Sequence, residues 1–225
     1  MSISVKADSL GDSATQERQA LEEAGAIKAA RGLVTVLDRA LLEAIAVQVA
    51  SRVGFGGLSI GQLADRVEMS KSGLFAHFRS KEQLQLQAME RARQRFVDVV
   101  IRPALAAPRG IARVRAVFDG WLEWTHQALQ GGCIFVAAAA ELDDQPGALR
   151  DALVRSERDW LEFIATVAGT AVAEGDLRDD LDLEQFAFEV HGVMLAHHHA
   201  SRLLHDERAE TRTRQAFESL LAGAR

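Results

Sequence analysis

The segment from Leu58 to Glu82, LSIGQLADRVEMSKSGLFAHFRSKE, constrains the fold more than any other part of this chain. Two short stretches with helical spacing follow one another in it. Each begins directly after a serine, Ser59 or Ser70, a residue type that caps helix N-termini well. The spacing predicts helices over about residues 60–67 and 71–78. Two short helices joined by a tight turn form a helix-turn-helix, and the second helix of that motif can enter the major groove of DNA.

The second predicted helix opens with small polar and basic side chains. Its N-terminal residues are those that reach base edges when such a helix lies in the groove. Lys71 can reach a guanine edge or a phosphate, Ser72 can donate to either, and Gly73 lets the backbone approach closely at a helix cost of about 1 kcal/mol. The simpler interpretation of Lys71 is a solvated surface lysine, but the surrounding motif favours contact with DNA.

Apolar positions of the same segment are expected to hold the three-helix unit together. Leu63, Ala64 and Val67 are predicted to face its interior, and the small Ala64 allows the two short helices to cross closely. Leu74 and Phe78 are predicted to anchor the second short helix against the first helix of the unit. We expect core roles for these five residues.

The distribution of charge supports nucleic-acid binding by one part of the chain only. The formal net charge of −6 argues against nucleic acid for the chain as a whole. Residues 30–102, however, carry 11 basic and 7 acidic side chains, whereas residues 103–225 carry 12 and 20 and residues 1–29 carry 3 and 5. A modestly basic module joined to an acidic one suggests that only the first meets phosphate. Ordinary scatter also produces such an excess, so charge alone does not decide.

The rest of the chain is predicted to be helical. Its 225 residues are 48% apolar, include three prolines and show no long alternation of valine and isoleucine. This composition favours an all-α protein with a sizeable core. Residues 1–29 are expected to form a flexible tail, with at most a fraying helix from Thr15 to Lys28. Residues 30–79 are predicted to form a helix-turn-helix domain of three helices, and residues 80–225 a larger helical domain.

Apolar spacing and helix-ending residues predict the individual helices. Gly54 is expected to end the first helix in a left-handed conformation, and Pro146 suits the first turn of a later helix. The first helix has an apolar stripe of Leu37, Leu41, Ile45 and Val49. The predicted helices outside the motif cover about residues 35–53, 80–105, 110–130, 134–142, 147–173, 183–204 and 209–221.

Cys133 is the only cysteine, which excludes an intramolecular disulfide and is typical of a reducing compartment. No run of about 18 apolar residues exists, and no apolar stretch follows the N-terminus, so neither a membrane span nor a signal peptide is predicted. We therefore expect a cytoplasmic protein without a membrane partner. Beside Ile134 and Phe135, Cys133 is expected to be a buried and inert thiol; a redox sensor is the alternative.

Over residues 35–85 the sequence resembles the tetracycline-repressor (TetR/AcrR) family of bacterial one-component regulators. Beyond that range only length and helical layout are similar. The resemblance implies a homodimeric repressor of transcription that binds a palindromic double-stranded DNA operator and is released by a small-molecule effector. No enzymatic activity and no cofactor are expected. Residues 80–225 would then bind the effector and dimerise. The resemblance rests on Ser59-Ile60, Leu63-Ala64, Met69-Ser70-Lys71, Leu74-Phe75, His77-Phe78 and the run from Ser80 to Leu84.

The resemblance also implies phosphate contacts for His77 and Lys81, which match positions that touch the DNA backbone in the family. Two residues depart from the family pattern. Phe75 stands where the family usually has Tyr; lacking that hydroxyl, it is expected to contribute packing alone. Glu68 stands where Gly is common, at a cost of roughly 1–2 kcal/mol if the residue is left-handed. The residues expected to contact DNA are Ser59, Ser70, Lys71, Ser72, Gly73, His77 and Lys81.

Aromatic and apolar residues of the second half are candidates for an effector pocket between helices. Ordinary core packing is the alternative for each of them. The candidates are Trp121, Trp124, His126, Phe135, Trp160, Phe163, Phe186 and Met194.

Histidines cluster near the end of the chain and suggest a different function. His191 and His198 share one helix stripe, and two histidines on one face bind zinc when further ligands join them. Adjacent His197, His198 and His199 point about 100° apart and cannot all meet one ion. We expect a pocket or dimer-interface role and assign no metal ligand. The alternatives are a metal-binding or metal-sensing protein that uses residues 191–199, or a helical adaptor without DNA binding.

Two long helices are expected to form the dimer interface. The helix over about residues 183–204 is apolar around much of its circumference and must be buried on most sides. Packing it, together with the helix over about residues 147–173, against a two-fold copy gives an isologous four-helix interface. The two recognition helices would then read half-sites about one DNA turn apart, or somewhat more.

Overall fold

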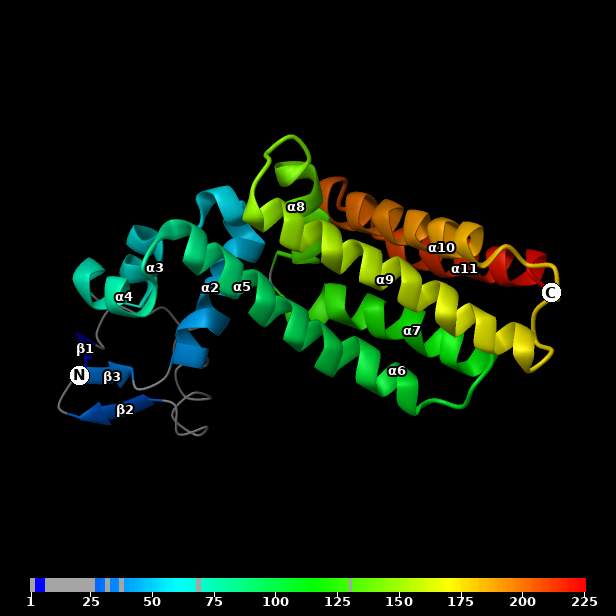
Figure 1. Cartoon of the computed structure of the whole chain (residues 1–225), viewed down its shortest axis with the longest axis horizontal. Coiled ribbons are helices and arrows are strands. Elements are labelled where there is room, and N and C mark those ends of the chain that lie inside the picture. The colour runs from blue at the N-terminus through cyan, green and yellow to red at the C-terminus, as the bar shows by residue number, and fades with distance from the viewer. Residues whose placement is uncertain (1–2, 7–26, 31–32, 37–38, 68–69, 130) are drawn as a thin grey trace. The chain divides into compact units, whose positions relative to one another are not determined.

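The computed structural model describes residues 3–6, 27–30, 33–36, 39–67, 70–129 and 131–225 (Figure 1). The chain divides into two compact units, residues 1–91 and 92–225. Both units are built mainly from helices, which confirms the predicted all-α class, and the first contains the helix-turn-helix. The helix α5 (Lys81–Phe96) begins in the first unit and ends in the second, so the units divide inside a helix rather than after residue 79.

Three short strands precede the helices of the first unit. They form an antiparallel sheet in the order β1-β3-β2, with Val36 opposite both Ile3 and Ile27. No strand was predicted here. Most of the helix expected from Thr15 to Lys28 lies outside the described residues. Its last two residues, Ile27 and Lys28, belong to β2 instead. The run LVTV of β3 is rich in β-branched residues, which favour extended backbone. The strands are β1 (Ile3–Lys6), β2 (Ile27–Ala30) and β3 (Leu33–Val36).

The first helix of this unit, α2, spans Arg39–Gly57. The predicted start near Thr35 is wrong, because Thr35 belongs to β3. Gly54 was expected to end this helix, but it lies inside α2 as a non-helical residue with a φ of 77° and a ψ of 168°. This backbone is extended at positive φ rather than left-handed helical, a region that essentially only glycine adopts.

The buried face of α2 differs from the predicted stripe. Ile45 and Val49 are partly exposed, and Leu37 lies outside the described residues. Because α2 is apolar on most sides, its sequence alone does not select one face. Ala46 and Ala50 allow neighbours to approach closely. The buried apolar residues are Leu41, Leu42, Ala46, Val47, Ala50 and Phe55.

The helix-turn-helix consists of α3 (Ile60–Arg66) and α4 (Lys71–His77), which pack against each other. Their bounds lie within one residue of the prediction. The five residues predicted to form the core of the motif, Leu63, Ala64, Val67, Leu74 and Phe78, are all buried. The sequence pattern therefore predicted both the helices and the side on which they are buried.

In the second unit α7, α9, α10 and α11 form a bundle (Figure 1), in which α10 packs against both α9 and α11, and α7 packs against α9. Asp182 caps α10, with 2.9 Å between its Oδ1 and the amide nitrogen of Gln185. Pro146 is not in the first turn of α9. The helix begins after Gly147, whose φ of 147° lies outside the helical region. The helices are α6 (Arg102–Ala106), α7 (Ile111–Glu123), α8 (Ile134–Leu142), α9 (Ala148–Ala173), α10 (Leu183–His198) and α11 (Ala209–Gly223).

Three of the long predicted helices contain a π-helical turn near one end. These turns are η1 (Val97–Ile101), η2 (Trp124–Ala128) and η3 (His199–Leu203). A π-helical turn adds a residue to the helical period and so rotates the side chains that follow it. A prediction that assumes 3.6 residues per turn therefore assigns residues beyond each π-helical turn to the wrong face of the helix. No helix among the described residues is long and apolar enough to cross a membrane.

Candidate nucleic-acid interface and ligand pocket

Serine side chains fix the N-terminal ends of both short helices. The Ser59 Oγ accepts a hydrogen bond from the amide of Gln62 at 3.2 Å, and the Ser70 Oγ accepts one from the amide of Gly73 at 3.1 Å. The Ser70 Oγ also lies 3.2 Å from the Ser72 Oγ. Ser59 and Ser70 therefore have a structural role as caps, which orients the exposed ends of α3 and α4.

The helix α4 has one buried edge and one exposed edge. Leu74 and Phe78 are fully buried, and the Arg39 guanidinium of α2 lies 5.8 Å from the centre of the Phe78 ring. Lys71 and Ser72 are exposed in the first turn of the same helix. This arrangement leaves polar and basic groups free to meet a nucleic acid while apolar groups hold the helix in place.

Phe75 is 52% exposed, so its ring is not part of the core of the unit. The expectation that it contributes packing alone, without a hydrogen bond to phosphate, stays a prediction. On a helix, residue 75 lies one turn after Lys71 and shares its outer edge. The side chain therefore presents an aromatic surface beside the polar groups of α4. Glu68, the other departure from the family pattern, lies outside the described residues.

Residues from both short helices converge around Gly61. A β-carbon at Gly61 would lie 3.5 Å from the Lys71 Cε and 3.8 Å from the Ser59 Oγ. The stem of Lys71 thus lies along the first turn of α3, with its ammonium group at the exposed surface. Glycine at this position keeps the approach open, because it has no side chain.

His77 and Lys81, the residues predicted to contact phosphate, lie around the C-terminal end of α4. His77 is half-buried, and its ring centre is 6.4 Å from that of Phe78. Lys81 is exposed, and its Nζ donates to the backbone oxygen of Gly56 at 2.7 Å. Lys81 therefore has a structural partner inside the unit, which sequence reasoning did not anticipate.

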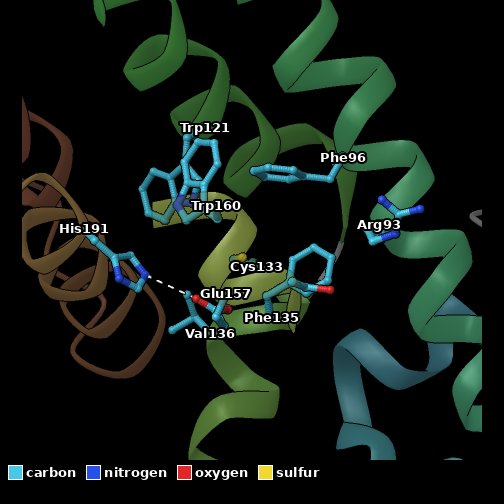
Figure 2. Close-up of a pocket in the computed structure, with 10 residues that line it drawn as sticks. Arg93, Phe96, Trp121, Cys133, Phe135, Val136, Glu157, Trp160 and His191 are labelled. Carbon is cyan, nitrogen blue, oxygen red and sulfur yellow. Dashed lines mark ion pairs between the residues drawn. The ribbon is translucent and has the colours of Figure 1, made fainter. Parts of the chain in front are cut away.

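The second unit contains a pocket of about 410 Å³, counting its solvent-open part (Figure 2). Three of the predicted candidates, Trp121, Phe135 and Trp160, line it. Phe96, at the end of α5, was not predicted, yet its ring meets those of Trp160, Trp124 and Phe135 edge-on, with centroid distances of 5.0, 5.2 and 5.7 Å. The remaining lining residues are Arg93, Cys133, Val136, Ser156, Glu157 and His191.

A carboxyl group and an imidazole face each other in this pocket. The Glu157 Oε2 and the His191 Nε2 are 3.6 Å apart, and the two side chains are 25% and 18% exposed. Burial raises the pKa of Glu157 and lowers the pKa of His191. Both directions favour the uncharged forms, because burial penalises charge on either group.

The other predicted pocket residues do not line the cavity. Trp124 is fully buried behind Phe96, Phe163 stacks on Trp160 with ring centres 5.9 Å apart, and Met194 and Phe186 are buried in the core. Trp124, Phe186 and Met194 are buried and Phe163 is partly exposed, so a side chain's place on the helix decides whether it borders a cavity.

His126 takes part in a separate polar cluster. Its Nε2 lies 3.4 Å from the Glu210 Oε2, and its ring is 5.7 Å from that of His197. His197 is buried, and its Nδ1 is 3.0 Å from the Thr213 Oγ1. Within the part of the chain that the structure describes, no three His, Cys, Asp or Glu side chains converge as metal ligands would.

Cys133 is buried in the pocket wall, and burial raises its pKa from 9.0 to about 11. A thiol with such a pKa is almost entirely protonated at neutral pH and is a poor nucleophile. The interpretation of Cys133 as an inert thiol is in line with this environment.

Glu157 was not predicted as a pocket residue, whereas His191 was expected either in a pocket or at the dimer interface. The sequence contains a signal for both. Glu157 lies between Leu153 and Trp160 at helical spacing, and both neighbours are buried. His191 lies in the same way between Ala187 and Met194. A titratable residue on an apolar helix stripe is either buried with a partner or directed at a ligand, and this rule identifies both residues.

Two family domains match the sequence. The domain described as "Bacterial regulatory proteins, tetR family" matches residues 41–88, and "Tetracyclin repressor-like, C-terminal domain" matches residues 110–217. No curated protein matches the chain.

The fold is similar to several solved structures. A TetR transcriptional regulator from Chloroflexus aurantiacus J-10-FL has a TM-score of 0.73 and 25% identity, covering 82% of this chain and 92% of that one. A TetR-family regulator from Cytophaga hutchinsonii has a TM-score of 0.73 and 18% identity, with 83% and 94% covered. AibR in complex with isovaleryl coenzyme A and operator DNA has a TM-score of 0.62 and 20% identity, with 80% and 98% covered.

The first family domain contains the helix-turn-helix α3 and α4, and the second contains the helices α7 to α10. The first turn of α4 carries exposed polar and basic side chains, Lys71 and Ser72. The chain belongs to the TetR family of bacterial regulatory proteins and is a DNA-binding transcriptional regulator.

Proposed function

We propose that the protein is a homodimeric repressor that binds a palindromic operator and leaves it when a small molecule occupies the pocket of the second unit. The exposed edge of α4 is the main support for this proposal. Lys71 and Ser72 are exposed there, on a helix whose other edge is fully buried. A helix held in this way enters the major groove without a change in its own packing.

The surface of α10 supports the homodimer. Phe188 and Leu195 are 68% and 40% exposed, which is unusual for large apolar side chains on a helix that also packs against α9. Gly192 lies between them on the same edge, and a β-carbon there would meet no atom within 4 Å. A stripe of this kind buries its apolar surface when a second copy packs against it about a two-fold axis.

The pocket supports regulation by a small molecule. It is a partly enclosed space lined by aromatic rings with a few polar groups, which is the usual character of a small-molecule site. AibR, a protein of similar fold, has been seen with both isovaleryl coenzyme A and operator DNA. An effector would shift the population toward a state that does not bind DNA, by no more than its difference in affinity for the two states.

The test is selection of DNA sites from a random double-stranded pool, followed by gel-shift titration of the selected site at two salt concentrations. We expect a two-fold symmetric site and binding that weakens steeply with salt. Lys71→Ala should weaken binding to the selected site, whereas the matched control Arg109→Ala, which alters an exposed cation of the second unit, should not.

Two results would contradict the proposal. Failure to enrich any sequence, with the protein folded, would favour the adaptor alternative. A selected site without two-fold symmetry, bound by a monomer in light-scattering measurements, would contradict the homodimer while leaving DNA binding intact.

A further inference from the structure

The ligand pocket is walled by aromatic rings that meet at steep angles. Phe96 makes interplanar angles of 86° with Trp160 and 79° with Phe135, and Trp121 completes the set (Figure 2). The rings therefore border the space from different directions rather than as one flat stack. Aromatic faces carry negative partial charge and attract a cation placed over them, most strongly in a desolvated site.

Among the described residues that line this pocket, Glu157 is the only carboxylic acid. Burying an ionised carboxylate is costly unless a positive charge or several hydrogen-bond donors compensate it. Among the described residues the one ion-pair partner recorded for Glu157 is His191, and burial favours the neutral form of that imidazole. The pocket thus contains a carboxyl group whose available partner is a weak counter-ion.

A negatively charged ligand fits this pocket poorly. Arg93 also lines it, but it is an exposed residue on the side opposite His191 (Figure 2). An anion that filled the aromatic space would approach the Glu157 carboxyl group and the negative faces of the rings. The ring faces oppose its binding and favour that of a cation. Burial alone favours the protonated form of Glu157, but a cation beside the group stabilises its carboxylate, whereas an anion does not.

We propose that this pocket binds a compact organic cation, an amine or quaternary ammonium whose charge lies between Glu157 and the faces of Trp121 and Trp160, with an apolar group against Phe96 and Phe135. The inference rests on the proposed function only in assigning this ligand the role of effector. The binding preference itself follows from the pocket and can be tested without DNA.

The test uses benzyltrimethylammonium and the full chain. All three tryptophans are useful reporters, since Trp121 and Trp160 line the pocket and Trp124 lies behind Phe96. We expect a saturable change in tryptophan fluorescence with the cation. The uncharged isostere neopentylbenzene should bind at least about tenfold more weakly, a difference of roughly 1.4 kcal/mol, and the anion phenylacetate more weakly still.

A matched pair of variants separates charge from shape. Glu157→Gln keeps the size of the side chain and removes its charge, so it should weaken benzyltrimethylammonium binding about tenfold and leave neopentylbenzene binding unchanged. Glu162→Gln, on the exposed side of the same helix, should change neither. The comparison of cation and isostere on the unaltered chain keeps the test decisive if Glu157→Gln does not fold.

Several outcomes would overturn the inference. These are no saturable binding of benzyltrimethylammonium at millimolar concentration, equal or tighter binding of neopentylbenzene or phenylacetate, or an unchanged affinity in Glu157→Gln. Gel shifts of the selected DNA with and without the cation then test the effector role separately. Cation binding that leaves DNA binding unaltered supports the pocket preference and contradicts its role as the regulatory site.

Discussion

The ammonium group of Lys81 donates a hydrogen bond to the backbone oxygen of Gly56, with 2.7 Å between Nζ and O. Lys81 is the first residue of α5 and Gly56 lies in the last turn of α2, so the contact joins two helices of the first unit. A cation at a helix C-terminus satisfies a free carbonyl group and interacts favourably with the helix dipole. Two further donors of the ammonium remain for a phosphate.

Lys81→Met, which keeps the apolar stem, should therefore have two effects. Loss of the hydrogen bond should lower the free energy of unfolding by about 0.5–1.5 kcal/mol in urea titrations. Loss of a phosphate contact should weaken binding to selected and random DNA alike and reduce the salt slope by about one unit. Stability that falls with an unchanged salt slope would show that Lys81 is structural only.

Ser70→Ala and Ser72→Ala should differ although the two serines are neighbours. Ser70 caps α4, so its loss should cost about 1 kcal/mol of stability. Ser72 is exposed within the first turn, and its loss should change the preferred DNA sequence with little effect on stability. Urea titration and repeated site selection measure the two quantities. The assignment of α4 as recognition helix is wrong if neither variant changes DNA binding.

Phe75 should contact the methyl group of a thymine. It is 52% exposed on the same edge as Lys71, and an apolar side chain in the major groove discriminates thymine by its C5-methyl group. Replacing each thymine of the selected site by deoxyuridine in turn should weaken binding by the unaltered protein at one position per half-site, and Phe75→Ala should abolish that effect. Phe75→Tyr should retain it. Equal binding to all uracil-substituted sites would contradict this contact.

Local signals explain which parts of the fold were predictable. The bounds of α3 and α4 followed from Ser59 and Ser70, because an N-cap and its first turn are contiguous in sequence. The pocket pair did not follow in this way. Glu157 and His191 come from different helices, and their approach depends on how α9 and α10 pack. Local patterns mark such residues as unusual, but they do not indicate which partner each one meets.

The start of α2 shows a second limit. The apolar spacing from Leu37 to Val49 begins directly after β3, and the helix predicted from it started near Thr35, inside that strand. Pairing of β3 with two other strands supplies hydrogen bonds that compete with helix in this segment, and one partner strand is near the N-terminus. The periodicity of one short segment contains no information about strands that pair with it from elsewhere in the sequence.

Leu195→Glu should disrupt the homodimer. Leu195 is exposed on α10 within the apolar stripe that includes Phe188, and a buried carboxylate at a two-fold interface would face its own copy. We expect a monomer in light-scattering measurements and weaker binding to a two-half-site DNA. Leu105→Glu provides the control, since Leu105 is similarly exposed but lies on α6. Dimerisation that survives in both Leu195→Glu and Phe188→Glu would contradict the proposed interface.

The thiol of Cys133 should make stability depend on pH in an alkaline window. Burial raises its folded-state pKa from 9.0 to about 11. Below that window both states hold the proton. Between the two values the unfolded chain releases the proton first, so the free energy of unfolding should fall by about 1.4 kcal/mol per pH unit.

Urea titrations of the unaltered protein and Cys133→Ser across this window measure the effect. The chain has no tyrosine, so thiolate ultraviolet absorbance can be followed without tyrosinate. The difference in stability between the two proteins should shrink as pH rises through the window and be constant below it. A difference that stays constant throughout, or a thiolate signal from the folded protein near pH 9, would show that Cys133 is accessible to solvent and available for oxidation, contrary to its buried position.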